Sequence, residues 1–304
     1  MTPTPTPETL PAATLPVSAS PVANSPAAAS PVANSPVLNS PVAIVTGGAR
    51  GIGLAISRWF LANGYRVALL DIDESTLAAT AELFKGADDV LCLPCDVSNP
   101  ASVNAAIAQV HGQFGRIDAL VNNAGIAVFK PIGETTFEEW RAVLSVNLDG
   151  AFLCTQACVP YMLKNDGNSG SSGHGQRGAV VNIASISGLR ASTLRVAYGT
   201  SKAAIIALTK QQAIELGNAG IRCNVIAPGP VDTEMSKLVH SVAIRSDYYD
   251  AIPLNRYGTT DEIASVAGFL CSAAASYVNG QVLAVDGGFD ASGVGLPTLR
   301  KHAT

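Results

Sequence analysis

The sequence predicts an α/β fold in which a doubly wound parallel sheet is covered by helices on both faces. Short apolar runs that end in turn residues alternate along the chain with longer segments of helical spacing. These runs lack the polar alternation of a strand with one face in water, so both faces of the sheet are expected to be buried. Apolar residues make up 48% of the 304 residues, which suffices for a large core.

The first strand is the apolar run 42–45 (VAIV), which is closed by Thr-Gly-Gly. Apolar residues then recur at helical spacing over 52–62, which predicts the first helix. The same alternation continues to the end of the domain. The further strands are predicted at 66–71, 90–95, 118–122, 179–184, 221–226 and 281–285, and the further helices at 74–85, 100–114, 137–163, 198–217 and 261–272.

Four segments fall outside this alternation. Residues 1–41 hold ten prolines at a near-regular spacing, which predicts a disordered tail. The tail is either a dispensable linker or a docking motif. The catalytic domain is predicted over 42–289. The Gly/Ser-rich residues 165–178 predict an exposed flexible loop. The long irregular stretch 229–260 is typical of a lid, and residues 290–304 form a C-terminal extension.

Charge and hydropathy exclude several classes of protein. A net charge of −4 provides no basic surface for nucleic acid. No apolar run approaches the roughly 20 residues of a membrane span. No Lys or Arg precedes Arg50, whereas secretory and transit signals are basic. We therefore expect a cytoplasmic protein that binds neither nucleic acid nor membranes.

The six cysteines include a CxxC pair, Cys92 and Cys95, whose spacing is compatible with a metal site or a redox role. No second CxxC is present, and no histidine lies within fifteen residues of the pair. The favoured interpretation is that both are small apolar residues at the end of a buried strand. The same holds for Cys154 and Cys158 on a predicted helix, so no metal site is expected.

A glycine-rich turn, Thr46-Gly-Gly-Ala-Arg-Gly-Ile-Gly53, joins the first strand to the first helix. Its glycines allow a tight turn and bring the backbone close to a pyrophosphate that rests on a helix N-terminus. No Gly-Lys-Ser/Thr follows, which excludes a P-loop. The turn thus predicts a dinucleotide site of the Rossmann type. The contacts expected from it are Gly47, Arg50, Gly51, Ile52 and Gly53.

An acidic residue, Asp71, ends the second strand 18 residues after Gly53. A carboxylate at this position binds the adenosine ribose hydroxyls, although a helix-initiating acid is the alternative. A carboxylate repels a ribose phosphate, so Asp71 favours NAD over NADP. Arg50 in the turn would favour NADP.

A tyrosine and a lysine, Tyr198 and Lys202, are four residues apart and share one face of a predicted helix. A nearby ammonium lowers the pKa of a phenol from about 10, which lets the tyrosine exchange a proton with an alcohol or a carbonyl near neutral pH. Ser185, thirteen residues earlier, ends a strand and would bond the substrate oxygen. Asn147 lies inside a predicted helix, where asparagine is mildly unfavourable. Its presence there indicates a functional role. A surface Tyr–Lys pair is the alternative.

These patterns occur in one order with Asn122-Asn123-Ala-Gly125, which ends the fourth strand. Together they resemble the short-chain dehydrogenase/reductase family over about residues 42–289. The resemblance implies a seven-stranded sheet and a homotetramer or homodimer. It implies that Tyr198 is the catalytic acid/base, and that Lys202 lowers its pKa and holds the nicotinamide ribose. Ser185 would then orient the reacting oxygen, and Asn147 would support a water-linked proton relay.

The resemblance also implies further cofactor contacts. They are Asp96 and Val97 at the adenine, Asn123 near the adenosine ribose, Gly125 beside the cofactor, and Pro228, Gly229, Val231 and Thr233 at the nicotinamide amide. Lys130, Arg190 and Arg195 lie near the site and either meet an anionic substrate or are solvated.

The expected activity is hydride transfer between NAD(P), with NAD preferred, and a small secondary alcohol or ketone. Sugars, polyols and 3-oxoacyl compounds are the expected substrates. The alternatives are a 3-oxoacyl-carrier-protein reductase that uses NADPH and a non-catalytic NAD-sensing protein.

Overall fold

The computed structural model describes residues 40–166 and 175–293, which belong to one compact unit that begins at Leu38. Its strands are parallel and form a seven-stranded sheet in the order β3-β2-β1-β4-β5-β6-β7. The strands are β1 (Val42–Thr46), β2 (Arg66–Asp71), β3 (Val90–Pro94), β4 (Ala119–Asn122), β5 (Gly178–Ile183), β6 (Ile221–Pro228) and β7 (Val282–Val285). The predicted doubly wound parallel sheet is confirmed.

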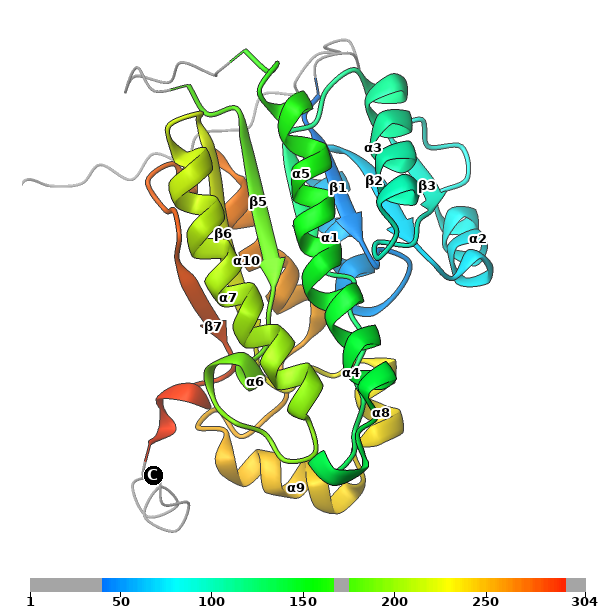
Figure 1. Cartoon of the computed structure of the whole chain (residues 1–304). Coiled ribbons are helices and arrows are strands. Elements are labelled where there is room, and N and C mark those ends of the chain that lie inside the picture. The colour runs from blue at the N-terminus through cyan, green and yellow to red at the C-terminus, as the bar shows by residue number, and fades with distance from the viewer. Residues whose placement is uncertain (1–39, 167–174, 294–304) are drawn as a thin grey trace, which may run out of the picture. The chain divides into compact units, whose positions relative to one another are not determined.

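Helices cover both faces of this sheet (Figure 1). One face carries α1 (Gly51–Ala62), α2 (Glu74–Leu83) and α10 (Thr260–Cys271), and the other carries α3 (Pro100–Phe114), α5 (Gly150–Met162) and α7 (Val196–Gly217). Successive side chains of a strand point to opposite faces. In β1, Val42 and Ile44 accordingly join the core under α3 and α5, while Ala43 and Val45 join the core under α1 and α10.

The chain reverses its winding at β1, which pairs with β2 on one side and with β4 on the other. In open α/β sheets a crevice forms at such a point, outside the carboxyl ends of the strands. The glycine turn after β1 and Asn123 after β4 both lie there.

A buried amide network joins α7 to the middle of the sheet. The Asn122 side chain donates to Asn182 Oδ1 at 2.8 Å, and the Asn182 amide donates to Thr209 Oγ1 and Gln212 Oε1, each at 2.9 Å. Buried polar groups of this kind are stable only when they are paired. The network therefore sets the position of α7, and with it the position of Tyr198 and Lys202.

Two predicted segments differ in detail from the structure. The predicted helix 137–163 consists of α4 (Phe137–Leu144), a π-helical turn η3 (Ser145–Asp149) and α5. The stretch 229–260, expected to be irregular, contains α8 (Glu234–Val239) and α9 (Val242–Ala251). Short 3₁₀ turns also occur at η2 (Ile132–Glu134), η4 (Ala273–Ala275) and η5 (Asp290–Ser292), and α6 is Ile186–Leu189.

The run Phe137–Met162 is long and apolar enough to cross a membrane by length and composition alone. Core helices of globular proteins pass the same test. Here Cys154, Cys158 and Met162 are buried in the core beside α3.

The cysteines of the described residues are unpaired, and Cys95, Cys154 and Cys158 lie in the core. Burial raises the pKa of Cys95 and Cys158, so these thiols resist ionisation. This confirms the interpretation of these three as buried apolar residues.

Several expectations fall mostly outside the described part of the chain. They concern the tail 1–41, of which Ser40 and Pro41 are described, the insertion 165–178 apart from its ends, and the extension 290–304 beyond residue 293. The first strand begins at Val42, where the sequence predicts the start of the catalytic domain.

Close packing of α1 against α10 depends on Gly268. A Cβ at this position would stand 2.3 Å from ring atoms of Trp59. We expect Gly268→Ala to lower the free energy of unfolding by about 1–3 kcal/mol through overpacking. Gly112→Ala is the matched control, because this exposed helical position has no described neighbour within 4 Å of a Cβ. It should stabilise the protein by about 0.5–1 kcal/mol. Urea titrations measure both, and equal effects would contradict the packing argument.

Candidate active site

The glycine turn follows β1 and opens α1. Gly47 and Gly51 adopt left-handed φ angles of +61° and +55°, which glycine tolerates without strain. A Cβ on Gly53 would stand 2.1 Å from the carbonyl oxygen of Gly47, so the turn is as tight as glycine permits. At Gly51 no described atom lies within 4 Å of a Cβ, which leaves the outer side of the turn open. A tight turn with an open face at a helix N-terminus fits a pyrophosphate.

The turn is held to β4 by Thr46 and Asn123. The Thr46 hydroxyl oxygen accepts hydrogen bonds from the backbone N–H groups of Asn123 and Ala124, each at 3.0 Å. The Asn123 amide donates to the carbonyl oxygens of Thr46 and Gly47, also at 3.0 Å. The Asn123 side chain thus supports the turn, and its contact with the ribose region stays a prediction. Sequence reasoning missed the part played by Thr46, whose signal is a polar residue at the end of an apolar strand.

The carboxylate of Asp71 is fixed beside the turn, with 8% of the residue exposed. Its two oxygens accept hydrogen bonds from the backbone N–H groups of Ala49 and Asp73, each at 3.1 Å. The N-cap of α2 is Asp73, which accepts from the N–H of Thr76. Asp71 is therefore not the helix-initiating acid. The guanidinium of Arg50 lies 3.6 Å from a carboxylate oxygen of Asp73, so the arginine is paired away from Asp71.

The segment after β3 places Asp96 and Val97 at the same edge of the sheet. Asp96 Oδ1 accepts from the backbone N–H and the hydroxyl of Ser98, at 2.9 and 2.7 Å. Val97 is buried, and a Cβ on Gly150 would stand 2.8 Å from its Cγ2. The adenine contacts assigned to Asp96 and Val97 stay a prediction.

A cavity of about 240 Å³ lies at the carboxyl ends of β4, β5 and β6. Ten of the predicted site residues line it: Ile52, Asn123, Gly125, Ser185, Tyr198, Lys202, Pro228, Gly229, Val231 and Thr233. The others lie outside its lining: Gly47, Arg50, Gly51, Gly53, Asp71, Asp96 and Val97 on the side of the glycine turn, and Asn147 behind Gly125 and Ile126.

Ser185 and Tyr198 meet in this cavity. Ser185 is the N-cap of α6, and its hydroxyl oxygen accepts from the backbone N–H of Ser187 at 3.1 Å. Burial raises the pKa of Tyr198, while a side-chain hydrogen bond with Ser185 and the charge of Arg195 act to lower it. The sequence predicts that Lys202 supplies the lowering charge. In the structure Arg195 also contributes a lowering charge, and the effect of Lys202 on Tyr198 stays a prediction.

Lys202 is buried with 4% of the residue exposed. Its Nζ donates to the carbonyl oxygen of Ile183 at 2.7 Å and lies 5.7 Å from the centre of the Tyr198 ring. Burial lowers the pKa of Lys202 to about 8. The ammonium thus donates to a strand carbonyl and also lies close to the tyrosine ring.

Asn147 lies in the π-helical turn η3, a type of helix irregularity frequent at functional sites. Its side chain accepts from the Ile126 N–H at 2.8 Å and donates to the Ile126 carbonyl and to Ser201 Oγ, at 3.0 and 2.9 Å. A Cβ on Gly125 would stand 3.3 Å from Asn147 Oδ1 and 3.4 Å from Lys202 Nζ. Asn147 thus holds the backbone of Ile126, which lines the cavity. The absence of a side chain at Gly125 lets Asn147 and Lys202 approach the backbone there.

The loop after β6 forms the opposite wall. A Cβ on Gly229 would stand 2.7 Å from the Cα of Asp286, so the loop packs directly on the segment after β7. Thr233 caps α8 by accepting from the N–H of Ser236 at 3.1 Å. Val231 forms a bridge with Gly258. Backbone and small side chains therefore form the wall where the nicotinamide amide is expected.

The three cations expected near the site differ in their surroundings. Lys130 forms an ion pair with Glu139. The guanidinium of Arg190 donates to the Phe289 carbonyl at 2.7 Å and stacks on the Phe289 ring. Arg195 alone of these three lines the cavity.

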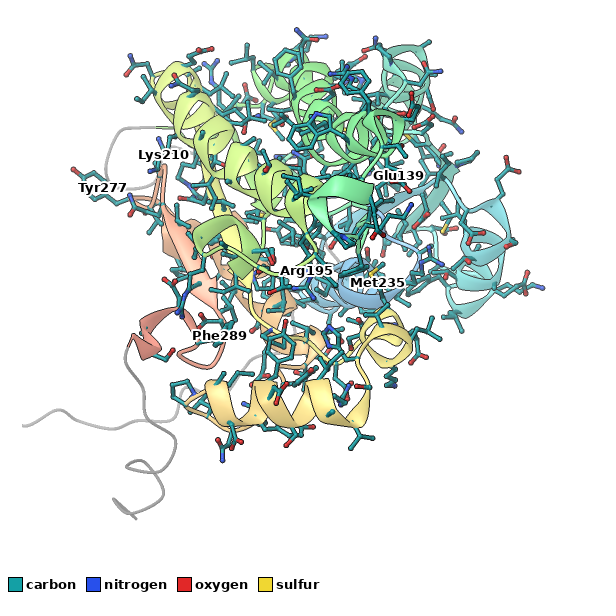
Figure 2. All side chains as sticks on the ribbon, turned by 60° about the horizontal axis from the view of Figure 1, so that its bottom comes forward. Glu139, Arg195, Lys210, Met235, Tyr277 and Phe289 are labelled. Atoms are coloured by element: carbon teal, nitrogen blue, oxygen red, sulfur yellow. The ribbon has the colours of Figure 1, made fainter. Side chains whose placement is uncertain are left out.

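Sequence reasoning did not name the side chains that close the outer end of the cavity. They are Met235, Val239, His240 and Tyr248 from the stretch 229–260, and Phe129 from the loop after β4. The length of that stretch was the available signal, and its function as a lid stays a prediction. Met235 and Arg195, both labelled in Figure 2, line the same cavity.

Comparison with known proteins accords with this geometry. A family model described as enoyl-(acyl carrier protein) reductase matches residues 47–290. The chain is 42% identical to 2-(R)-hydroxypropyl-CoM dehydrogenase of Xanthobacter autotrophicus, over 82% of this chain and 98% of that protein. The chain belongs to the short-chain dehydrogenase/reductase family. It is 38% identical to a 3-oxoacyl-[acyl-carrier-protein] reductase of Chlamydia muridarum, over 81% and 96% of the two chains.

A crystal structure of levodione reductase superposes on this member of the family with a TM-score of 0.74 at 36% identity, covering 83% of this chain and 98% of that one. The chain is therefore an oxidoreductase that acts on CH–OH groups with NAD(P), and its substrate is a small molecule.

The buried Lys202 predicts a stability that depends on pH. Its pKa is about 8 in the folded chain and near 10.5 in the unfolded chain, so the unfolded chain holds more protons between these values and stability rises with pH there. Below pH 8 the full cost of the buried charge is present. We expect Lys202→Met to stabilise the protein at pH 7 by about 1–2 kcal/mol, after loss of the Ile183 hydrogen bond. The gain should vanish near pH 10.

Melting curves from pH 7 to pH 10 measure this difference. The control is Lys210→Met on the same helix, because the Lys210 side chain is exposed and its ammonium stays in water. A lower melting temperature for Lys202→Met at every pH would contradict the desolvation argument.

Proposed function

We propose that the protein oxidises a secondary alcohol with NAD and that Tyr198, Ser185, Lys202 and Asn147 carry out the proton chemistry. The observation that carries this proposal is the meeting of Ser185, Tyr198 and Lys202 in one cavity, at the sheet edge that also holds the glycine turn. Bound NAD would supply the hydride acceptor for the alcohol carbon. The residues of the chain bind and orient both reactants and move the proton.

Tyr198 accepts the proton of the alcohol in this proposal. The phenol must give up its own proton first, and burial opposes that ionisation while Ser185 and Arg195 favour it. Ser185 donates a hydrogen bond to the reacting oxygen. Lys202 holds the nicotinamide ribose and provides a buried positive charge beside the ring of Tyr198.

Asn147 is proposed to support a water-linked proton relay that serves Tyr198. It fixes Ile126 through two hydrogen bonds and Ser201 through a third, and the Ser201 hydroxyl donates to the Tyr198 carbonyl oxygen at 2.7 Å. The chain of contacts thus runs from η3 to the backbone of the catalytic tyrosine.

The preference for NAD over NADP is proposed from Asp71. Its carboxylate is fixed next to the turn, where it repels a phosphate on the adenosine ribose. Arg50 lies 3.6 Å from Asp73 in an exposed ion pair, which weakens the argument for NADP. An NAD-linked enzyme with this site suits oxidation of a sugar, a polyol or another small alcohol.

The alternative is a 3-oxoacyl-carrier-protein reductase that uses NADPH, as the name of one relative suggests. A non-catalytic NAD sensor is the alternative from another class, and the complete Ser-Tyr-Lys-Asn set argues against it. We also propose a homotetramer or homodimer in the cytoplasm. The exposed apolar residues Phe137, Phe152 and Ile214 on α4, α5 and α7 support contacts between subunits.

Replacing Tyr198 tests the chemistry. Tyr198→Phe removes the hydroxyl and keeps the ring, so we expect kcat to fall by roughly 10²–10⁴-fold while NAD still binds. NADH absorbance measures turnover and calorimetry measures NAD binding. Tyr277→Phe is the control, because Tyr277 is fully exposed on the surface (Figure 2). Unchanged turnover in Tyr198→Phe would overturn the proposal.

Replacing Asp71 tests the cofactor preference. We expect kcat/KM to favour NAD over NADP by at least about tenfold, which corresponds to ~1.4 kcal/mol. Asp71→Ser should shrink this ratio, and Asp88→Asn at an exposed loop position should leave it unchanged. Equal kcat/KM values for the two nucleotides in the unaltered protein would show that Asp71 does not select NAD.

A further inference from the structure

The cavity is lined by a cation, Arg195, that forms no ion pair with any residue in the described part of the chain. Arg195 lies at the N-terminus of α7, three residues before Tyr198, and lines the cavity with Phe129, His240 and Tyr248. Residues three apart on a helix are neighbours on its surface. The effect of the Arg195 charge on the pKa of Tyr198 agrees with this short separation.

The contacts of the Arg195 guanidinium in the described chain are to neutral groups, and they are long. One Nη lies 3.4 Å from the Tyr248 hydroxyl, the other lies 3.5 Å from His240 Nε2, and the group stacks 5.1 Å from the centre of the Phe129 ring. A guanidinium has five N–H donors in a planar fork. Contacts at these distances satisfy few of them.

Two cations beside the cavity are paired with carboxylates, and the Lys202 ammonium at its inner end donates to the Ile183 carbonyl oxygen. Lys130 is paired with Glu139, and Arg245 donates to Asp232 at 3.0 Å. Among the described residues no carboxylate forms an ion pair with Arg195, so its charge faces the cavity.

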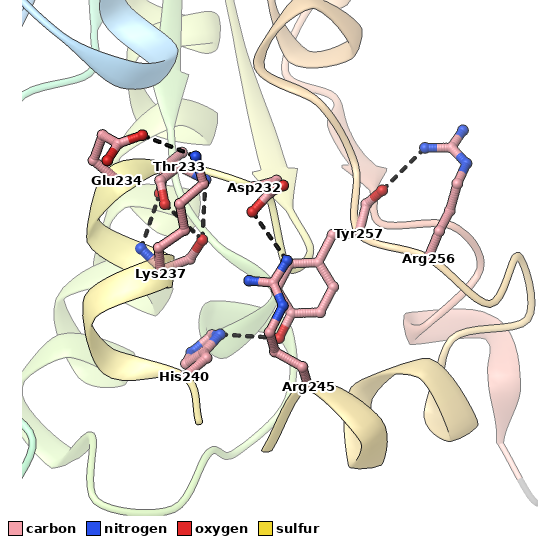
Figure 3. A network of polar contacts seen from close by, with 9 residues as sticks. Asp232, Thr233, Glu234, Lys237, His240, Arg245, Arg256 and Tyr257 are labelled. Carbon is pink, nitrogen blue, oxygen red and sulfur yellow. Dashed lines mark hydrogen bonds and ion pairs between the residues drawn. The ribbon is translucent and has the colours of Figure 1, made fainter. Parts of the chain in front are cut away.

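The groups beside Arg195 are held in place. His240 Nδ1 lies 3.0 Å from the Tyr257 hydroxyl, and the guanidinium of Arg245 stacks 4.3 Å from the centre of the Tyr257 ring (Figure 3). On the other side, the Lys130 N–H donates to the Leu194 carbonyl at 3.1 Å, and Leu194 adopts a left-handed φ of +61°. A leucine rarely adopts this conformation, and packing must hold it there.

We propose that Arg195, with Tyr248, binds an anionic group of the substrate. The substrate is then a short hydroxy or oxo compound with a carboxylate, sulfonate or phosphate a few bonds from the reacting carbon. A guanidinium fork matches the oxygens of such groups in pairs. The Tyr248 hydroxyl supplies a further donor. The inference rests on the proposed function, because Tyr198 places the reacting oxygen next to this subsite.

Matched substrates test the inference with the full-length protein and NAD. The anionic set is 3-hydroxybutyrate, 2-hydroxypropanesulfonate and 2-hydroxypropyl phosphate, and the neutral set is 2-butanol and 2,3-butanediol. We expect kcat/KM to be at least about 30-fold higher for one of the anions than for both neutral alcohols, since hydrogen bonds to charged groups are strong. The three anions distinguish which headgroup fits.

Variants at Arg195 then separate recognition from structure. Arg195→Gln should lower kcat/KM for the preferred anion by on the order of 100-fold, mostly through KM. The neutral alcohols should show only the smaller loss of kcat that follows from removing a charge that lowers the pKa of Tyr198. Arg195→Lys keeps the charge and should recover part of the loss. Arg190→Gln is the control, because Arg190 is bound to Phe289 outside the cavity lining.

The outcomes distinguish this inference from the proposed function. Equal losses of kcat/KM for anions and neutral alcohols in Arg195→Gln would overturn the anion subsite. No preference for anions in the unaltered protein would overturn it as well. In either case, oxidation of the neutral alcohols would still support the proposed function. Failure to oxidise any alcohol with either nucleotide would overturn both.

Discussion

The site depends on the join between β1 and β4. Thr46 and Asn123 exchange hydrogen bonds across this join, and the Asn123 amide holds the glycine turn by its carbonyl oxygens. The turn can then present its open side and the N-terminus of α1 to a pyrophosphate. Because parallel strands end at one edge, the same join aligns Asp71 on β2 with Ser185 after β5. One geometric constraint thereby brings the glycine turn, Asp71 and the cavity of Ser185 to one edge of the sheet.

Burial determines the chemistry at the other end of the site. The same desolvation raises the pKa of Tyr198 and lowers the pKa of Lys202, so both groups are biased toward their neutral forms. Arg195 and Ser185 oppose this bias at the tyrosine. The amide network through Asn182 holds α7, and the positions of these groups depend on that helix.

The sheet was predictable because its strands are apolar runs, and the glycine turn was predictable because only glycine allows that backbone. The π-helical turn at Asn147 was not, since it depends on contacts with Ile126 and Ser201 that are far apart in sequence. The hydrogen bonds of the Asn123 side chain to the glycine turn could not be predicted either, because they also join residues far apart in sequence. The structure was also needed to show which nearby cation lines the cavity. Lys130 is paired with Glu139, whereas Arg195 lines the cavity, and the sequence does not reveal these surroundings.

A crystal structure with NAD bound tests the central claim most directly. The account predicts that the pyrophosphate lies on the turn between Gly47 and Gly53, that the adenosine ribose bonds Asp71, and that the nicotinamide C4 faces the cavity between Ser185 and Tyr198. A nucleotide bound elsewhere, or one whose nicotinamide points away from Tyr198, would contradict it.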